Sequence, residues 1–205
     1  AIELVEGRDY VLDRRPFGLQ GRLRDAVQAA FRTPFLAKVL NGEHALAQDE
    51  ARLLRAREAL AAFGLNDAQV TAGAAAIATE SLALVQGPPG TGKTRLLAAV
   101  TAALCRRTCR IALCAFTHRA VGNALLAIRS AAPELPVFKL ASSSSDDHDE
   151  LRAAGVQIVD ARRVKLPEKG CVVAGTCYQL AKLQDRERFH YTVFDEAGQR
   201  SEERR

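Results

Sequence analysis

Eight residues near the middle of the chain have the types and spacing needed to bind phosphate groups. Residues 87–94 read GPPGTGKT, which matches the pattern G-x-x-x-x-G-K-[ST]. The three glycines let the backbone wrap closely around an anion and turn its N–H groups inward. A helix that begins after the loop would point its positive N-terminal dipole at the same anion. The pattern therefore predicts a site for the phosphates of a nucleoside triphosphate.

Two side chains at the end of this loop are expected to supply a charge and a metal ligand. Lys93 would place its ammonium at the β- and γ-phosphates, and Thr94 would offer its hydroxyl to Mg²⁺. Upstream, the amide of Gln69 can donate and accept at once, which suits the edge of adenine. ATP and Mg²⁺ are the expected cofactors, with nucleotide contacts from Gln69, Gly87, Pro88, Pro89, Gly90, Thr91, Gly92, Lys93, Thr94 and Arg95.

The flanks of the loop favour a strand before it and a helix after it. Residues 81–86 form a short apolar run, which is typical of a buried parallel strand. One face of the predicted helix after the loop carries Leu96, Leu97, Val100 and Leu104. A chance loop rich in glycine and proline is the alternative, and both flanks weigh against it.

An acidic pair follows a predicted strand further along the chain. Residues 191–194 read YTVF and are expected to form a strand, and Asp195 and Glu196 come directly after them. Ligands of open α/β sheets bind at the carboxyl ends of the strands. Asp195 is expected to bind Mg²⁺ together with Thr94, and Glu196 to activate the attacking water. The predicted catalytic residues are Lys93, Asp195 and Glu196; the alternative is an acidic pair that only closes a strand.

Strands and helices alternate through the second half of the chain. Apolar runs predict strands at 110–116 and 171–175, and shorter ones at 137–140 and within 155–161. This alternation predicts an α/β fold with a parallel sheet and helices on both faces. Residues 1–63 are expected to form a mostly helical bracing segment, and residues 64–205 the ATP-binding lobe. Within the first segment, the sequence suggests a strand at 9–13 and helices from Leu19, over 34–41 and over 43–63.

The composition limits the class of protein. The chain has 205 residues, is 48% hydrophobic and carries a formal net charge of +5, which permits a polyanionic partner without demanding one. No apolar run reaches membrane-spanning length and no signal peptide opens the chain, so a cytoplasmic protein without a membrane partner is expected. Five cysteines without a C-x-x-C pair are expected to be buried free thiols.

Three motifs in this order resemble superfamily 1B helicases. They are GPPGTGKT at 87–94, AFTHRAVGNAL at 115–125 and DEAGQ at 195–199. The resemblance is to the group that includes the nonsense-mediated-decay helicase, senataxin and bacterial relatives fused to RecB-type nucleases. LNDAQ at 65–69 resembles the adenine-reading Q motif of these proteins. VVAGT at 172–176 resembles their strand-plus-threonine segment, which contacts the nucleic-acid backbone.

This resemblance implies a RecA-like P-loop NTPase lobe that hydrolyses ATP to move along or unwind DNA or RNA. It also implies that Thr117, His118 and Thr176 contact a single strand of nucleic acid. Two positions depart from the family pattern, which usually has Asn where His118 stands and Asp where Gly122 stands. A histidine can still hydrogen-bond a phosphate, whereas a glycine cannot replace a carboxylate.

The family needs a second RecA-like lobe, which brings an arginine finger to the transferred phosphoryl group. The sequence stops at Arg205 and contains no methionine, so we expect a piece of a longer motor that is weakly active or inactive alone. A nucleotide-binding module without significant turnover is the alternative from another class. A small-molecule P-loop kinase is a third, but no lid-like Arg-rich segment supports it. No motif separates DNA from RNA.

Overall fold

The computed structural model describes residues 28, 31–43, 49–79, 81–141, 148–183 and 186–196. The chain divides into two compact units, Ala1–Ala45 and Leu46–Arg205. The predicted strand at 9–13, the start of the helix at Leu19 and Gln199 lie outside the described residues. The boundary between these units falls between residues 45 and 46. The division of the chain into a bracing segment at 1–63 and an ATP-binding lobe at 64–205 remains a prediction.

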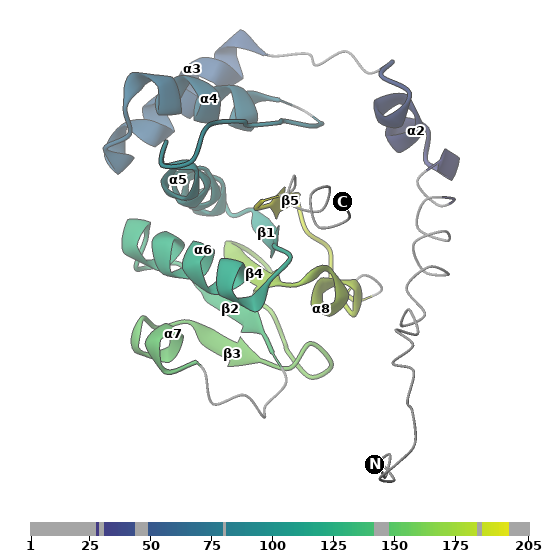
Figure 1. Ribbon diagram of the computed structural model, residues 1–205, viewed down its shortest axis with the longest axis vertical. Coiled ribbons are helices and arrows are strands. Elements are labelled where there is room, and N and C mark those ends of the chain that lie inside the picture. Colours follow the sequence, from purple (N-terminus) through teal and green to yellow (C-terminus); the bar gives the residue numbers. More distant parts are fainter. Residues whose placement is uncertain are drawn as a thin grey trace, which may run out of the picture. The chain divides into compact units, whose positions relative to one another are not determined.

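In the first unit, helix α2 spans Pro34–Leu40 (Figure 1). Thr33 precedes it in an extended conformation, and proline stands at the first helical position, where its missing N–H is not needed. The backbone N–H of Asn41 donates to Ala37 O as the helix ends. Gly42 follows in a left-handed conformation, with a φ of 71°. The prediction of a short helix here is confirmed.

The second unit opens with a helical layer of α3 (Glu50–Leu60), the 3₁₀ turn η1 (Ala61–Phe63) and α4 (Asp67–Ala78). The sequence suggested one helix over 43–63, but α3 begins at Glu50. The reason is that Asp49 caps it: one carboxylate oxygen accepts from the N–H groups of Ala51 and Arg52, at 2.8 and 3.2 Å. Gly64 ends η1 with a φ of 60°, as expected of a helix-stopping glycine.

Within the described residues, five strands form one sheet in the order β3-β2-β4-β1-β5. They are β1 (Arg110–Cys114), β2 (Val137–Leu140), β3 (Gln157–Val159), β4 (Cys171–Gly175) and β5 (Tyr191–Phe194). All the ladders are parallel, and Cys114 at the end of β1 lies opposite Gly175 on one side and Phe194 on the other. The carboxyl ends of all five strands therefore share one edge.

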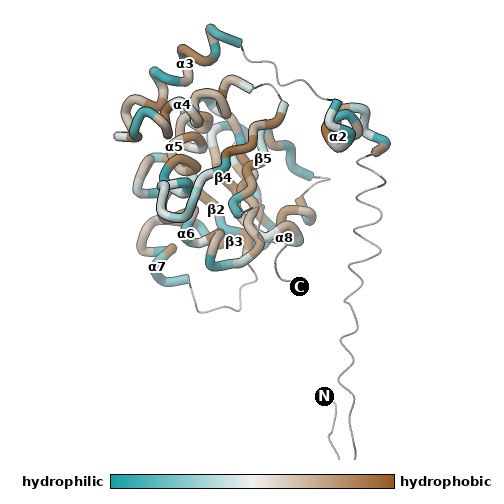
Figure 2. The backbone as a smooth tube through the Cα atoms, turned by 45° about the horizontal axis from the view of Figure 1, so that its top comes forward, coloured by the Kyte–Doolittle hydropathy of each residue, from teal (hydrophilic) through white to brown (hydrophobic). Residues whose placement is uncertain are grey.

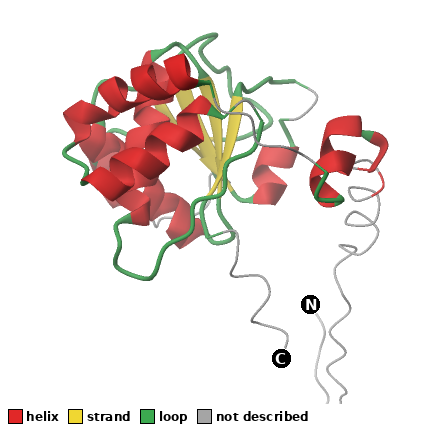
Figure 3. Cartoon of the chain, turned by 90° about the horizontal axis from the view of Figure 1, so that it is seen from above, coloured by secondary structure: helices red, strands yellow, loops and turns green. Residues whose placement is uncertain are grey.

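Helices cover both faces of this sheet. They are α5 (Lys93–Arg106), α6 (His118–Ala131), α7 (Asp149–Ala153) and α8 (Cys177–Ala181). Helices α5 and α6 lie side by side on one face of the sheet, and α8 lies on the other face (Figure 1). Most helices of the second unit therefore gather on one side of the strands (Figure 3). The α/β architecture with a parallel sheet is confirmed and is consistent with a RecA-like P-loop fold.

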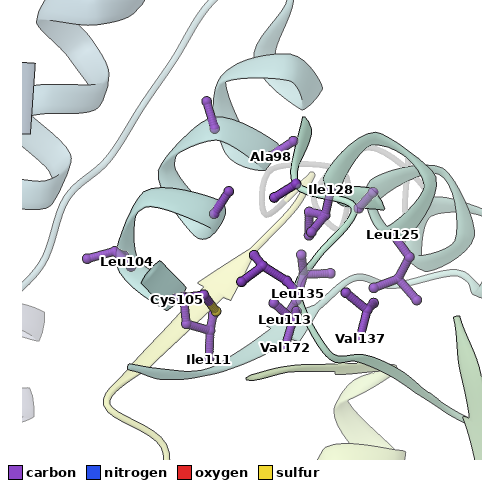
Figure 4. Packing of buried hydrophobic residues seen from close by; sticks show 14 of the residues in the cluster. Ala98, Leu104, Cys105, Ile111, Leu113, Leu125, Ile128, Leu135, Val137 and Val172 are labelled. Atoms are coloured by element: carbon purple, nitrogen blue, oxygen red, sulfur yellow. The ribbon is translucent and has the colours of Figure 1, made fainter. Parts of the chain in front are cut away.

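Alternation along the strands divides the core into two clusters. Ile111, Leu113 and Val172 pack with α5 and α6, where Cys105, Leu125 and Ile128 meet them (Figure 4). Val173 and Leu140 face the opposite side and pack with Leu183. In Figure 2 the strands β2 and β4 are coloured mainly as hydrophobic, whereas hydrophobic and hydrophilic residues alternate along α3. No helix in the described ranges is long and apolar enough to cross a membrane.

The predicted strand before the phosphate loop is wrong. Residues 81–88 are irregular, and the side chains of Leu84 and Val85 are 83% and 45% exposed. No described strand forms a ladder with this segment, and β5 pairs only with β1. An apolar run becomes a buried strand only when a neighbouring strand pairs with its backbone polar groups, and composition alone does not reveal that neighbour.

Helices α3, α4 and α5 meet at Gly73. A Cβ at this position would lie 2.8 Å from Leu96 Cδ1, 2.9 Å from Leu60 Cδ1 and 3.3 Å from Val100 Cγ2. Leu60 and Leu96 therefore fill the space over the glycine, and Leu60 is fully buried. The absence of a side chain at Gly73 lets the helical layer approach α5, the helix that follows the phosphate loop.

Leu60→Ala should lower the free energy of unfolding by about 2–5 kcal/mol, because it leaves a cavity at this three-helix junction. The matched control is Leu54→Ala on the same helix, where the side chain is 61% exposed; it should change stability by less than about 0.5 kcal/mol. Urea unfolding followed by circular dichroism measures both. Equal losses in the two variants would mean that the helical layer does not stabilise the fold through this contact.

Candidate nucleotide-binding site

The phosphate loop is an open backbone turn in front of α5. Gly90 and Gly92 have φ values of 79° and 78°, a left-handed conformation that other residues rarely adopt. The hydroxyl of Thr91 donates to Pro88 O at 2.8 Å and closes the turn. No atom outside the neighbouring residues lies within 4 Å of a Cβ built on Gly90, so a ligand can approach the backbone closely there.

Lys93 holds its ammonium inside this turn. Its Nζ donates to the carbonyl oxygens of Gly87 and Pro88, each at 2.8 Å. These two carbonyl oxygens hold the ammonium at the start of the loop. Phosphate oxygens would replace them as stronger, charge-assisted acceptors.

Helix α5 leaves its first N–H groups available to a ligand. Gly92 occupies the N-cap position and offers no side-chain cap to this helix of 14 residues. Uncapped N–H groups and the positive end of the helix dipole attract anions. Thr94 is exposed in the first turn, where its hydroxyl could reach a metal ion on the phosphates. The loop, the ammonium and the open helix end thus fit a bound triphosphate.

Gln69 links α4 to the loop with both ends of its side-chain amide. Its Oε1 accepts from the backbone N–H of Asn66 at 3.0 Å, and Asn66 Oδ1 accepts from the backbone N–H of Gln69 at 2.9 Å. This reciprocal arrangement is a capping box that starts α4, with Asn66 as its N-cap. The Nε2 of Gln69 also donates to Thr91 O at 3.0 Å.

Gly92 gives Gln69 the room for this contact. A Cβ at Gly92 would lie 2.5 Å from Gln69 Nε2, so a side chain there would displace the amide. The bond to Thr91 uses one N–H of the Gln69 side chain, and the bond from Asn66 uses one lone pair of its oxygen. The second N–H and the second lone pair stay available to a ligand. An adenine contact by Gln69 thus remains a prediction, to which the structure adds a tether to the loop.

Arg95 points its guanidinium at the start of the helical layer. Its Nη2 donates to Gly64 O at 2.8 Å and to Phe63 O at 3.4 Å. The guanidinium thereby ties the first turn of α5 to the junction between η1 and α4. A nucleotide contact by Arg95 remains a prediction.

The acidic pair lies at the carboxyl end of β5, as expected. The backbone N–H of Asp195 donates to Cys114 O at 2.9 Å, which continues the pairing of β5 with β1. Glu196 is exposed and has a φ of 56°, a left-handed value that is uncommon for glutamate. Among the described residues, no hydrogen bond or ion pair joins this pair to Lys93 or Thr94, so the two halves of the predicted site do not contact each other directly.

The two predicted strand-contacting threonines begin helices at the same sheet edge. Thr117 follows β1 and caps α6, where its Oγ1 accepts from the N–H of Ala120 at 3.0 Å. Thr176 follows β4 and precedes α8, and its backbone N–H donates to Gln179 Oε1 at 2.9 Å. Because β1 and β4 are neighbours in register, both threonines lie at adjacent strand ends.

His118 stands beside two other basic side chains. Partial burial, followed by the charges of Lys139 and His148, lowers the pKa of His118 from its usual value. A neutral imidazole at pH 7 can donate a hydrogen bond to a phosphate but brings no charge. Gly122 is buried four residues further along α6, where its nearest neighbour is Leu151 of α7 at 3.8 Å from a built Cβ.

Sequence reasoning missed a buried basic contact near this edge. The side chain of Lys139 in β2 is 3% exposed, and its Nζ lies 3.3 Å from Nδ1 of His148, which is 6% exposed. The available signal was the single charged residue in the strand VFKL. Arg129 in the last turn of α6 donates to the carbonyls of Ala154, Pro133 and Leu135, so its guanidinium is held within the fold.

Comparison with known proteins finds one family match. Residues 64–165, about half of the chain, match the AAA domain family. The chain is also 32% identical over 141 residues to the DNA replication ATP-dependent helicase/nuclease JHS1 of Arabidopsis thaliana, an alignment that covers 66% of this chain and 10% of that protein. The chain thus spans about a tenth of this relative's length. No solved structure matches.

Replacing Gln69 should loosen the phosphate loop. Gln69→Ala removes both its capping bond and its bond to Thr91 O, whereas Asn66→Ala removes only a capping bond. Each change should cost about 0.5–2 kcal/mol of stability through the cap. Hydrogen–deuterium exchange at the amides of residues 91–93 should speed up markedly in Gln69→Ala alone. Identical loop exchange in both variants would contradict a tether through Gln69.

Proposed function

The family match and the plant relative support a superfamily 1 helicase-like N-terminal lobe in this chain, and from this premise we propose that it is the ATP-binding lobe of a nucleic-acid-dependent ATPase. In this proposal ATP is hydrolysed to ADP and phosphate, and the whole motor uses that energy to move along or unwind nucleic acid. The observation that carries the proposal is the loop 87–94, which presents two left-handed glycines and the Lys93 ammonium before the uncapped start of α5.

On the nucleotide side, each chain residue has a separate task. The backbone N–H groups of the loop and of the first turn of α5 would hold phosphate oxygens, and Lys93 would exchange its two carbonyl partners for them. Gln69 would orient the adenine while its tether holds Thr91 in place. These contacts position the triphosphate without chemistry of their own.

The acidic pair, Asp195 and Glu196, would bind Mg²⁺ and activate the attacking water. Thr94 and Asp195 would hold Mg²⁺, which neutralises charge on the phosphate oxygens when it is bound. Glu196 would accept a hydrogen bond from the water and remove its proton. Its left-handed backbone at the end of β5 supports a functional role, because residues held in sparsely populated conformations cluster at active sites.

A single strand of nucleic acid would lie along the carboxyl edge of the sheet. The hydroxyls of Thr117 and Thr176 and the start of α6 can donate to successive phosphates, and His118 can add a hydrogen bond. Such contacts read the backbone and not the bases. The name of the plant relative includes DNA replication, so single-stranded DNA is the first substrate to test.

Turnover is expected to need a second RecA-like lobe with an arginine finger, because its absence can lower the rate by about 10³–10⁵-fold. A nucleotide-binding module without significant turnover is the second candidate. The exposed position of Glu196, which has no contact with Lys93 or Thr94 among the described residues, favours this reading for the isolated chain. ATPase assays of a protein that joins this chain to a second RecA-like lobe, with and without single-stranded DNA, distinguish the two, because only the first candidate should gain turnover.

Lys93→Ala should weaken Mg·ATP binding roughly ten- to hundredfold, because a charge-assisted phosphate contact contributes about 1.5–3 kcal/mol. The matched variant Glu196→Gln should bind ATP like the wild type and lose whatever hydrolysis remains. Isothermal titration calorimetry and a phosphate-release assay measure the two effects. Unchanged ATP binding by Lys93→Ala would show that the loop does not hold the phosphates.

Replacing both threonines should weaken strand binding on every sequence alike. Thr117→Ala with Thr176→Ala removes two phosphate contacts, whereas Thr117→Ser with Thr176→Ser keeps both hydroxyls and should bind normally. For the unaltered chain we expect dissociation constants near the non-specific range of ~10⁻⁴–10⁻⁶ M and a steep decrease in affinity with salt. Fluorescence anisotropy with labelled homopolymers across a salt series measures this. Binding that ignored salt or survived the alanine pair would refute the proposed path.

A further inference from the structure

We propose that Cys114 and Cys177 form a reversible disulfide when the protein meets a peroxide, and that this bond ties together the ends of β1 and β4. The cysteine pair is proposed as a modification site independently of the proposed function. Its effect on strand binding rests on the proposed function, because both cysteines lie at the sheet edge assigned there to nucleic acid.

The two sulfur atoms already face each other. Cys114 is the last residue of β1, and Cys177 is the first residue of α8, two positions after the end of β4. Their Sγ atoms are 3.2 Å apart. A disulfide bond is about 2.05 Å long, so the sulfurs need to approach by only about 1 Å. The sequence predicted five buried thiols, and this is wrong for Cys177, which is exposed, and for Cys109, which is half-buried.

The two thiols differ in solvent exposure, and this difference gives them different roles in the oxidation. Cys114 is buried, and burial followed by the neighbouring Cys177 raises the pKa of its thiol to about 12. Cys114 is therefore shielded from solvent and seldom ionised. Cys177 lies at the surface and meets a dissolved oxidant first. An exposed thiol beside a second, resolving thiol is the arrangement found in redox-sensitive pairs.

The reaction proceeds in two balanced steps. The Cys177 thiolate attacks one oxygen of the peroxide, so that an S–O bond forms, the O–O bond breaks and hydroxide leaves. The Cys114 sulfur then attacks the resulting sulfenic acid, an S–S bond forms, the S–O bond breaks and water leaves with the Cys114 proton. Two thiols and one hydrogen peroxide thus give one disulfide and two waters. A dithiol reductant reverses the result.

The crosslink would act on three functional segments at once. Cys177 is the neighbour of Thr176, so a shift of Cys177 moves the first turn of the short helix α8. Cys114 lies three residues before Thr117, and its carbonyl accepts the N–H of Asp195. Hydrogen bonds weaken steeply with misalignment. Displaced threonines would therefore contact the phosphates less well.

The experiment treats the 205-residue chain with one equivalent of hydrogen peroxide, alkylates free thiols and maps peptides by mass spectrometry. The expected result is a loss of about 2 Da, a Cys114–Cys177 peptide and full reversal by dithiothreitol. Cys109→Ser is the matched control and should behave like the wild type. Cys177→Ser, at an exposed position, should fold normally by circular dichroism and form no crosslink.

Strand binding is measured on the same samples by anisotropy. Oxidation should weaken binding about tenfold in the wild type and leave Cys177→Ser unchanged. A peptide linking other cysteines, or stable oxidation of Cys177 without a crosslink, would overturn the proposal. A crosslink without any loss of binding would overturn its regulatory part. If the reduced chain binds no strand, the proposed function fails, while the peptide map still decides the disulfide.

Discussion

The burial of helix α5 on nearly every side is the constraint on which the rest of the second unit depends. Ala98, Ala99, Ala102 and Ala103 are 0–4% exposed, so small side chains bring α5 close to its neighbours. Helices α4 and α6 pack against it, and it also contacts β1 and β4. A helix held this closely cannot shift without opening cavities. The phosphate loop ends where that fixed helix begins, so its position is set by the core.

Two side chains convert this packing into a defined loop. Gln69 connects the start of α4 to Thr91, and Arg95 connects the first turn of α5 to Gly64. Both bonds end on backbone carbonyls, so they restrain the chain itself. The segment before the loop has no comparable restraint from the sheet, because residues 81–88 form no strand. The loop is thus positioned from its helical side.

The parallel sheet positions the predicted site residues outside the phosphate loop, as α5 positions the loop itself. Since all five described strands run in one direction, the residues that follow them gather at one edge. Thr117, Thr176 and Asp195 reach this edge from strands that are neighbours in space but distant in sequence. The same geometry brings Cys114 to Cys177, although 63 positions separate them. The proposed strand path and the proposed thiol pair are therefore two consequences of one topology.

The sequence by itself determined the features that depend on local chemistry. The phosphate loop, the caps at Asn66 and Gly64, and strands β1 to β5 follow from nearby residues, because capping, turn formation and periodicity act over a few positions. The tertiary structure alone decided the features that need a distant partner. The exposure of Leu84, the tether from Gln69 to Thr91 and the meeting of Cys114 with Cys177 depend on which segments pack together. An apolar run or a single thiol carries no information about its neighbour in space.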